Sequence, residues 1–207
     1  MSKLIPSSSL GSSSTKTARV GVLGLQGDFS EHLTTLRAMG ADAVDVRKAE
    51  QLDDIDALII PGGESTTIGK LAQHYGIIPK LRQRADEGMP VWGTCAGAIF
   101  IAKDVPGHPH PLAGLMDITV ERNAFGRQID SFEADLDVTG MSDGPFHAVF
   151  IRSPKITRTG SDVVVLARLR DGTIVAAREG KLLATSFHPE LTRDERFHRL
   201  FLALGER

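Results

Sequence analysis

The first half of the chain repeats one unit, in which a short apolar run ends in a turn and is followed by apolar residues at helical spacing. The apolar runs lie at Val20–Leu25, Ala43–Val46, Ala57–Ile60 and Val91–Thr94. Helical patterns cover Phe29–Met39, Thr66–His74, Pro79–Glu87 and Ala98–Lys103. Parallel strands need crossover connections of this kind, so the alternation predicts an α/β fold. We expect a flavodoxin-like three-layer sandwich, with a mostly parallel central sheet and helices on both faces.

The second half of the chain has a different pattern, with short strand candidates separated by turns such as Asp171-Gly172 and Glu179-Gly180. The candidates lie at Ile118–Val120, Phe132–Val138, Ala148–Ile151, Val163–Leu169, Thr173–Arg178 and Leu182–Ser186. This spacing predicts antiparallel hairpins added to the parallel sheet. Apolar residues on one face of Thr192–Leu204 predict a closing helix.

Composition limits the partners of the chain. Its 207 residues are 41% apolar and 24% charged, which fits one globular domain. The formal charge of −2 gives no general attraction to nucleic acid or an anionic membrane, and no apolar run approaches the roughly 20 residues of a membrane helix. The single cysteine, Cys95, excludes an intrachain disulfide and a cysteine-rich zinc site. A lone thiol fits a reducing compartment, where it is either a small buried hydrophobe or a nucleophile.

Residues 1–18 differ in composition from the rest. They are rich in serine, contain no acidic residue and carry Lys3 and Lys16. Such a segment buries too little apolar area to order itself. We interpret it as a disordered tail, either added for expression or natural, or as a targeting extension, although no arginine precedes Arg19. Residues 19–207 are expected to form one domain.

Cys95 lies in the sequence Gly93-Thr94-Cys95-Ala96-Gly97, between an apolar strand and an apolar helix. This G-x-C-x-G pattern is the thiol form of a nucleophile turn. The turn holds the nucleophile in a strained conformation, and side chains two positions to either side would collide with neighbouring elements. It directs the Ala96 N–H to the space above the sulfur, where an oxyanion would form. The alternative is a small residue packed at a tight strand–helix junction.

His188 and Glu190 follow the last predicted strand, and in an extended chain residues i and i+2 project to the same side. Pro189 stiffens the pair. A carboxylate that accepts one imidazole N–H leaves the other nitrogen free to take a thiol proton. Two alternatives stay open, a surface His-Pro-Glu and a His/Glu metal pair, although no third ligand is evident nearby. His108 and His110 lie in a loop rich in proline and glycine, which we interpret as a solvated connector.

The loop Pro61-Gly62-Gly63-Glu64-Ser65-Thr66-Thr67 joins the third strand to a helix. Its glycines let an N–H such as that of Gly63 point at a ligand, and Ser65 or Thr66 can cap the helix. The phosphate-binding pattern G-x-x-x-x-G-K-[ST] is absent, and residues 21–27 do not form G-x-G-x-x-G. At the carboxyl edge of a parallel sheet this loop can lie beside the Cys95 turn and supply a second oxyanion donor.

These motifs together resemble the class I, triad-type glutamine amidotransferases. Within that class the segments VLGLQGD, PGGESTTIG, GTCAG, ERNAFGRQIDSFEADL, VFIRSP and SFHPELT are similar to the family of glutaminase subunits of two-protein pyridoxal 5′-phosphate synthases. The resemblance runs from about Arg19 to the end of the chain. It departs from the family at the N-terminal tail, at Ser153, where alanine is frequent, and in the loop from Val105 to Leu112.

The resemblance implies hydrolysis of L-glutamine to L-glutamate and ammonia through a thioester. It assigns these residues: a triad of Cys95, His188 and Glu190; glutamine contacts at Gly63, Glu64, Ser65, Arg122, Ile151 and Arg152; oxyanion donors at Gly63 and Ala96. An arginine offers a planar fork for the substrate carboxylate, and Glu64 a charge for the ammonium. No cofactor or metal is expected.

The resemblance also implies a partner and a place. The ammonia would pass to a (β/α)8-barrel synthase subunit, in a large cytoplasmic hetero-oligomer, which makes pyridoxal 5′-phosphate (vitamin B6) from a pentose phosphate and a triose phosphate. The competing hypotheses are a cysteine peptidase or amidase on the same scaffold, and a glutamine sensor without activity. A peptidase would need an open cleft for a polypeptide, and a sensor would not need all three triad residue types.

Overall fold

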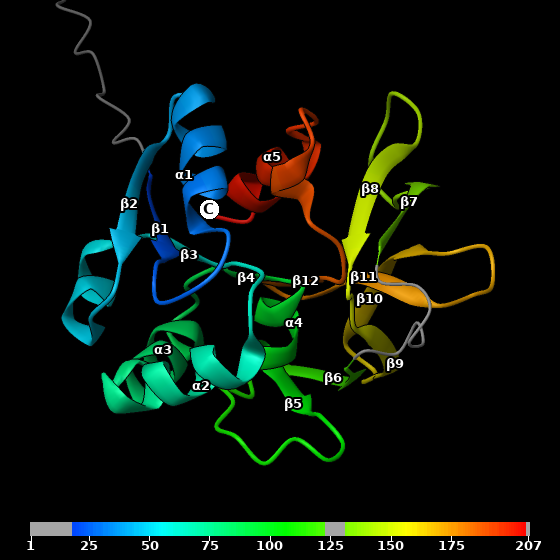
Figure 1. The fold of residues 1–207 in the computed structure, drawn as a ribbon. Helices are drawn as coiled ribbons and strands as arrows, with labels where there is room; N and C mark the ends of the chain where they lie inside the picture. The colour runs from blue at the N-terminus through cyan, green and yellow to red at the C-terminus, as the bar shows by residue number, and fades with distance from the viewer. Residues whose placement is uncertain (1–17, 123–130, 206–207) are drawn as a thin grey trace, which may run out of the picture.

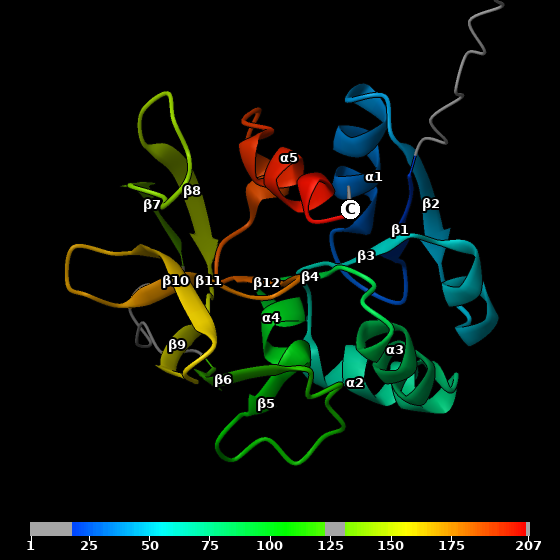
Figure 2. The same cartoon turned by 180° about the vertical axis from the view of Figure 1, so that it is seen from behind.

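The computed structural model describes residues 18–122 and 131–205, and they form three layers (Figure 1). A central sheet is covered by α1 (Phe29–Ala38) and α5 (Arg196–Ala203) on one face. The other face is covered by α2 (Ser65–His74), α3 (Ile77–Asp86) and α4 (Ala96–Ile101), as the reverse view in Figure 2 also shows. The predicted flavodoxin-like α/β sandwich is confirmed. The tail at 1–17 and the middle of the Glu121–Leu136 motif, residues 123–130, lie outside the described residues.

The large sheet has the strand order β2-β1-β3-β4-β12-β11-β9-β6-β5, with β10 paired to β11. Its parallel part consists of β2 (Asp42–Val46), β1 (Arg19–Leu23), β3 (Ala57–Ile60), β4 (Val91–Thr94) and β12 (Leu182–Thr185). The rest consists of β11 (Ile174–Glu179), β10 (Val163–Arg168), β9 (Lys155–Thr159), β6 (Met116–Glu121) and β5 (Ala102–Asp104). Antiparallel pairing joins β12, β11, β10, β9 and β6, while β7 (Ser131–Leu136) and β8 (Phe146–Ile151) form a separate antiparallel pair. The predicted hairpins are thereby confirmed.

Three elements differ from the sequence predictions. The helix expected over Ala98–Lys103 ends at Ile101, and the chain continues as β5. It ends there because the carbonyls of Phe100 and Ile101 accept hydrogen bonds from the N–H groups of Ala113 and Leu115. The closing helix begins at Arg196 and not at Thr192, after a 3-10 turn, η2 (Pro189–Leu191). Strand β9 was not predicted, since Ile156 is its only apolar residue.

Two apolar clusters fill the spaces on either side of the sheet. One lies under α2, α3 and α4 and the other under α1 and α5. Trp92 of β4 is fully buried in the second cluster, with its ring 5.6 Å from that of Phe201. Because β3 and β4 are buried on both faces, their sequences are continuously apolar rather than alternating. A second 3-10 segment, η1 (Ala49–Asp54), connects β2 to β3. Within the described ranges no helix is both long and apolar enough to cross a membrane.

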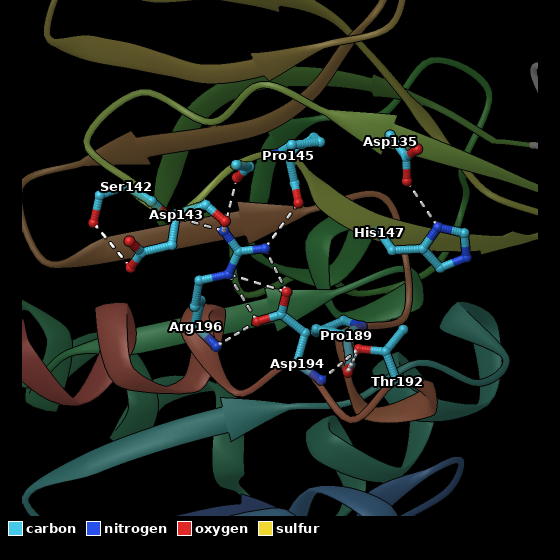
Figure 3. A network of polar contacts seen from close by, with 10 residues as sticks. Asp135, Ser142, Asp143, Pro145, His147, Pro189, Thr192, Asp194 and Arg196 are labelled. Atoms are coloured by element: carbon cyan, nitrogen blue, oxygen red, sulfur yellow. Dashed lines mark hydrogen bonds and ion pairs between the residues drawn. The ribbon is translucent and has the colours of Figure 1, made fainter.

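Arg196, at the start of α5, links the C-terminal segment to the turn that precedes β8 (Figure 3). Its guanidinium donates to the carbonyls of Ser142, Gly144 and Pro145 at 3.0, 2.8 and 2.8 Å. It also donates to the Asp194 carboxylate at 2.6 to 3.0 Å. This charged side chain therefore links the turn before β8 to the segment between η2 and α5.

We expect Arg196→Ala to lower the free energy of unfolding by about 2 kcal/mol, because hydrogen bonds to a charged group are among the stronger ones in a protein. Chemical denaturation of the purified chain measures this change. The control is Arg199→Ala on the same helix, whose ion pair with Glu195 at 2.6 Å is exposed. Its effect should stay within about 0.5 kcal/mol. Equal losses for the two variants would contradict the assigned role of Arg196.

Candidate active site

A cavity of 450 Å³ opens at the carboxyl ends of β3, β4 and β8. Its lining includes every proposed site residue except Glu190, which is buried behind His188: Gly63, Glu64, Ser65, Cys95, Ala96, Arg122, Ile151, Arg152 and His188. It also includes Asp28, Ile99 and Leu191, which were not predicted. Ligand sites of open parallel sheets lie at this edge. A wider hollow of 1070 Å³ beside β7 and β10 has neither cysteine nor histidine in its lining.

The turn at Cys95 is strained in the way that the sequence predicts. Cys95 has φ 47° and ψ −105°, between the end of β4 and the start of α4. A side chain on Gly93 would collide with the backbone of Gly97, and one on Gly97 would collide with the carbonyl of Ile60. Cys95 is only 6% exposed, but it lines the cavity, and its sulfur lies 3.8 Å from the Ile151 carbonyl oxygen. This placement favours a reactive thiol over a packing residue.

The backbone conformation that brings His188 and Glu190 together differs from the extended one that was predicted. The backbone of His188 has φ −106° and ψ 86°, which is neither helical nor fully extended, and Pro189–Leu191 forms the 3-10 turn η2. This turn brings Glu190 Oε1 to 2.7 Å from His188 Nδ1. The His188 N–H donates to the Val149 carbonyl at 2.8 Å, so β8 fixes the backbone of the pair. Their side chains are 5% and 0% exposed, which excludes a surface pair.

Interactions with neighbouring side chains outweigh burial at both groups. Burial lowers the pKa of His188, but hydrogen bonds with Cys95 and Glu190 raise it to about 10. Burial raises the pKa of Glu190, but the neighbouring His32 and His188 lower it to about 2. The pair is therefore an imidazolium beside a carboxylate at neutral pH.

Asp28 is a third acidic group at this site, which the sequence reasoning missed. Its Oδ2 lies 3.5 Å from His188 Nδ1, and the expectation that no third ligand lies near His188 and Glu190 is wrong. Atoms of Asp28, His188 and Glu190 lie within 4.8 Å of one another, close enough to hold a metal ion. However, ligands at about 2.1 Å from a tetrahedral zinc stand about 3.4 Å apart. The 2.7 Å between His188 and Glu190 fits a hydrogen bond better.

The glycine loop packs directly against the histidine. A side chain on Gly62 would collide with the His188 ring, and Gly63 has φ +146°, which suits glycine. Gln26 Oε1 accepts the N–H of Glu64 at 2.6 Å, and the Gly62 carbonyl accepts the N–H of Asp28 at 3.2 Å. The loop is therefore held by the segment between β1 and α1.

Glu64 and not Ser65 or Thr66 caps α2. Its carboxylate accepts the N–H groups of Thr66 and Thr67 at 3.1 and 2.8 Å, because the longer side chain reaches back over the first turn. Burial alone would raise the pKa of Glu64, but these hydrogen bonds lower it to about 2. Its second neighbour is Arg122, with Nη2 at 3.5 Å from Oε1.

Two arginines border the cavity. Arg122 follows β6, and its Nη1 lies 3.1 Å from His108 Nδ1, so the loop interpreted as a solvated connector reaches the site at His108. Arg152 follows β8 with φ 47°, and it makes no ion pair with any described residue. Both guanidinium groups are placed where they could receive a ligand carboxylate.

Comparisons with known proteins identify chains that are similar to this one over most of its length. A sequence model described as the SNO glutamine amidotransferase family matches residues 22–206. A protein of Herpetosiphon aurantiacus named pyridoxal 5′-phosphate synthase subunit PdxT is 58% identical over 89% of this chain and 99% of that protein. A protein of Dehalococcoides mccartyi with the same name is 56% identical over 91% of this chain and 97% of that protein. A crystal structure described as a glutamine amidotransferase superposes with TM-score 0.86 and 56% identity, over 91% of this chain and 99% of that one.

We expect His188 to titrate at about pH 10, which NMR of ¹³C-labelled imidazole carbons measures. Because its folded pKa lies above the ordinary value of 6.5, the stability that it contributes is fully present below pH 6.5 and is lost as the pH rises through about 10. Glu190→Gln should lower the titration midpoint, and Asp28→Asn, the matched control at 3.5 Å, should lower it less. A wild-type midpoint near 6.5, or equal changes in the two variants, would contradict this assignment.

Proposed function

The chain belongs to the SNO glutamine amidotransferase family, and we propose on this basis that it hydrolyses L-glutamine with Cys95, His188 and Glu190. The observation that carries the proposal is the His188–Glu190 hydrogen bond beside a thiol in a strained turn. Together they form the constellation of nucleophile, base and orienting carboxylate that acyl transfer requires.

The first half of the reaction forms a thioester. The Cys95 proton rests on His188 at neutral pH, and the Cys95 thiolate attacks the side-chain amide carbon of glutamine. The negative charge that develops on the amide oxygen is stabilised by the N–H groups of Ala96 and Gly63. The His188 imidazolium then protonates the amide nitrogen, the C–N bond breaks, and ammonia leaves.

The second half regenerates the free Cys95 thiolate. Neutral His188 takes a proton from water, and the resulting hydroxide attacks the thioester carbon. The C–S bond breaks, L-glutamate is released, and the thiolate and imidazolium pair is restored. Glu190 accepts the Nδ1–H throughout, which keeps Nε2 directed at the sulfur and stabilises the imidazolium.

The residues around the cavity fit an amino acid with a free carboxylate and ammonium. We assign glutamine contacts to Gly63, Glu64, Ser65, Arg122, Ile151 and Arg152, which all line the cavity. Arg122 or Arg152 supplies a planar donor pair for the carboxylate. The low pKa of Glu64 keeps a negative charge at the cavity for the ammonium, while the same carboxylate caps α2.

The names of the relatives support a role in pyridoxal 5′-phosphate synthesis. We propose that the ammonia passes to a (β/α)8-barrel synthase subunit in a cytoplasmic hetero-oligomer, which combines it with a pentose phosphate and a triose phosphate. A peptidase with the same triad would cleave peptides, and a glutamine sensor would bind glutamine without turnover. Glutamate release from glutamine, with and without the synthase subunit, separates these alternatives.

We expect Cys95→Ala and His188→Asn each to lower the rate constant of glutamate release by about 10³-fold or more, and Glu190→Gln to lower it less. The thiolate has no substitute in this chain, whereas the carboxylate orients and stabilises the histidine. The rates are measured in the presence of the synthase subunit. Calorimetry provides the control, because Cys95→Ala should still bind glutamine. Wild-type turnover by Cys95→Ala would overturn the proposed function.

We also expect slow glutamate release by the free chain and a clear increase on addition of the synthase subunit. Ammonia released into neutral water becomes ammonium, a poor nucleophile, so coupled hydrolysis avoids wasted glutamine. The Gly62–Gly63 peptide is the element best suited to complete the oxyanion hole on docking. Steady-state rates across a titration of the partner measure the effect. A constant rate despite confirmed complex formation would exclude this gating and leave the triad chemistry untouched.

A further inference from the structure

A buried polar cluster lies behind Glu190, on the side away from the cavity. It contains His32 of α1 and His198 of α5, both with no exposed surface. The two helices lie side by side on one face of the sheet (Figures 1 and 2). Trp92 of β4 closes the cluster, with its ring edge-on to both imidazoles at 5.7 and 5.1 Å. None of these side chains lines the cavity.

The cluster lies beside the second carboxylate oxygen of Glu190, Oε2. Glu190 Oε1 accepts from His188, but Oε2 has no well-aligned hydrogen bond within the described residues. Its polar neighbour is His32 Nε2, at 3.3 Å. The same nitrogen lies 3.4 Å from Thr94 Oγ1, so both oxygens lie close to this one nitrogen of His32. A buried carboxylate needs such a donor to stay ionised and in place.

The second imidazole determines which nitrogen of His32 carries a proton. His32 Nδ1 lies 3.0 Å from His198 Nε2. Burial lowers the pKa of His198 to about 3, so His198 is neutral and has one N–H. Its Nδ1 has no partner in the described part of the chain, and a buried N–H without an acceptor is rarer than an unsatisfied acceptor. The proton therefore lies on Nε2 and is donated to His32 Nδ1, which leaves His32 Nε2–H for Glu190.

We propose that His32 is a positioning residue for the glutaminase reaction, which holds the Glu190 carboxylate through Oε2, and that His198 fixes the tautomer of His32. The donations run from His198 to His32 and from His32 to Glu190, while His188 donates to the other oxygen. With Oε1 bound to His188 and His32 Nε2 3.3 Å from Oε2, rotation of the carboxylate away from His188 Nδ1 is disfavoured. This role rests on the proposed function, because it acts through Glu190 and touches no substrate.

The test compares two amides at position 32 in the full-length chain. The amide of His32→Gln reaches the position of Nε2 and can donate to Glu190, whereas that of His32→Asn reaches only the position of Nδ1. We expect His32→Asn to lower kcat for glutamate release about tenfold with KM changed less than about twofold, and His32→Gln to stay within about threefold of the wild type. Packing alone would also favour the larger Gln, so a second experiment separates packing from the effect on Glu190.

A double-mutant cycle shows whether His32 acts through Glu190. In a Glu190→Gln background, His32→Asn should change kcat by less than about twofold, because the carboxylate that it positions is gone. Thr185→Val is the matched control, since it removes an equally buried partner of Trp92, at 3.1 Å from its Nε1, without touching Glu190. It should leave kcat unchanged in both backgrounds.

The outcomes separate this proposal from the proposed function. Absence of glutamate release by the wild type with its synthase subunit would overturn the function itself. Active wild type with equal kcat for His32→Asn and His32→Gln, or an equal effect of His32→Asn in both backgrounds, would overturn only the positioning role. If His32→Asn fails to fold, His198→Asn and His198→Gln provide the same comparison, and Gln, which keeps a donor at Nε2, should be the more active.

Discussion

The close approach of α4 to β3 is the constraint on which the site depends. The carbonyl of Ile60 occupies the place where a side chain on Gly97 would stand, so the first turn of α4 contacts the β3 backbone itself. Gly93 packs as closely against Gly97 on the other side of the turn. Cys95 is therefore fixed beside the loop that follows β3, and Ala96 and that loop line one cavity. A single methyl group at either glycine would separate these parts.

Burial at this site opposes every charge that the proposed chemistry needs. It disfavours the His188 imidazolium and the Glu190 carboxylate alike, and charge interactions and hydrogen bonds with neighbouring side chains reverse the effect. Glu64 reaches a similarly low pKa by another route, because N–H groups of α2 surround an otherwise half-exposed carboxylate. The charge of Glu64, at the mouth of the cavity, depends on backbone N–H donors. The charges of His188 and Glu190, in the interior, depend on each other. Loss of one interior partner therefore affects all of them.

The sequence predicts those parts of the structure that depend on local constraints. The strand, turn and helix around Cys95 follow from two glycines within five residues, and the parallel sheet follows from the repetition of apolar runs. The sequence does not predict contacts between distant segments. Asp28, His32 and His198 reach the site from α1 and α5, and His32 lies in a helix whose pattern indicates only a buried face. Strand β9 and the cap by Glu64 were missed because neighbouring strands and side-chain reach decide them.

The late start of α5 has a physical cause that connects fold and site. Had the helix begun at Thr192, residues 192–195 would be helical and the chain from η2 would leave the sheet in another direction. Instead Asp194 accepts both the N–H and the guanidinium of Arg196, at 3.0 Å, and Arg196 binds the turn before β8. That turn sets the start of β8, and β8 in turn accepts the His188 N–H at Val149. The irregular stretch from η2 to Arg196 therefore has two consequences. It allows β8 to position His188, and it allows α1 and α5 to enclose Glu190.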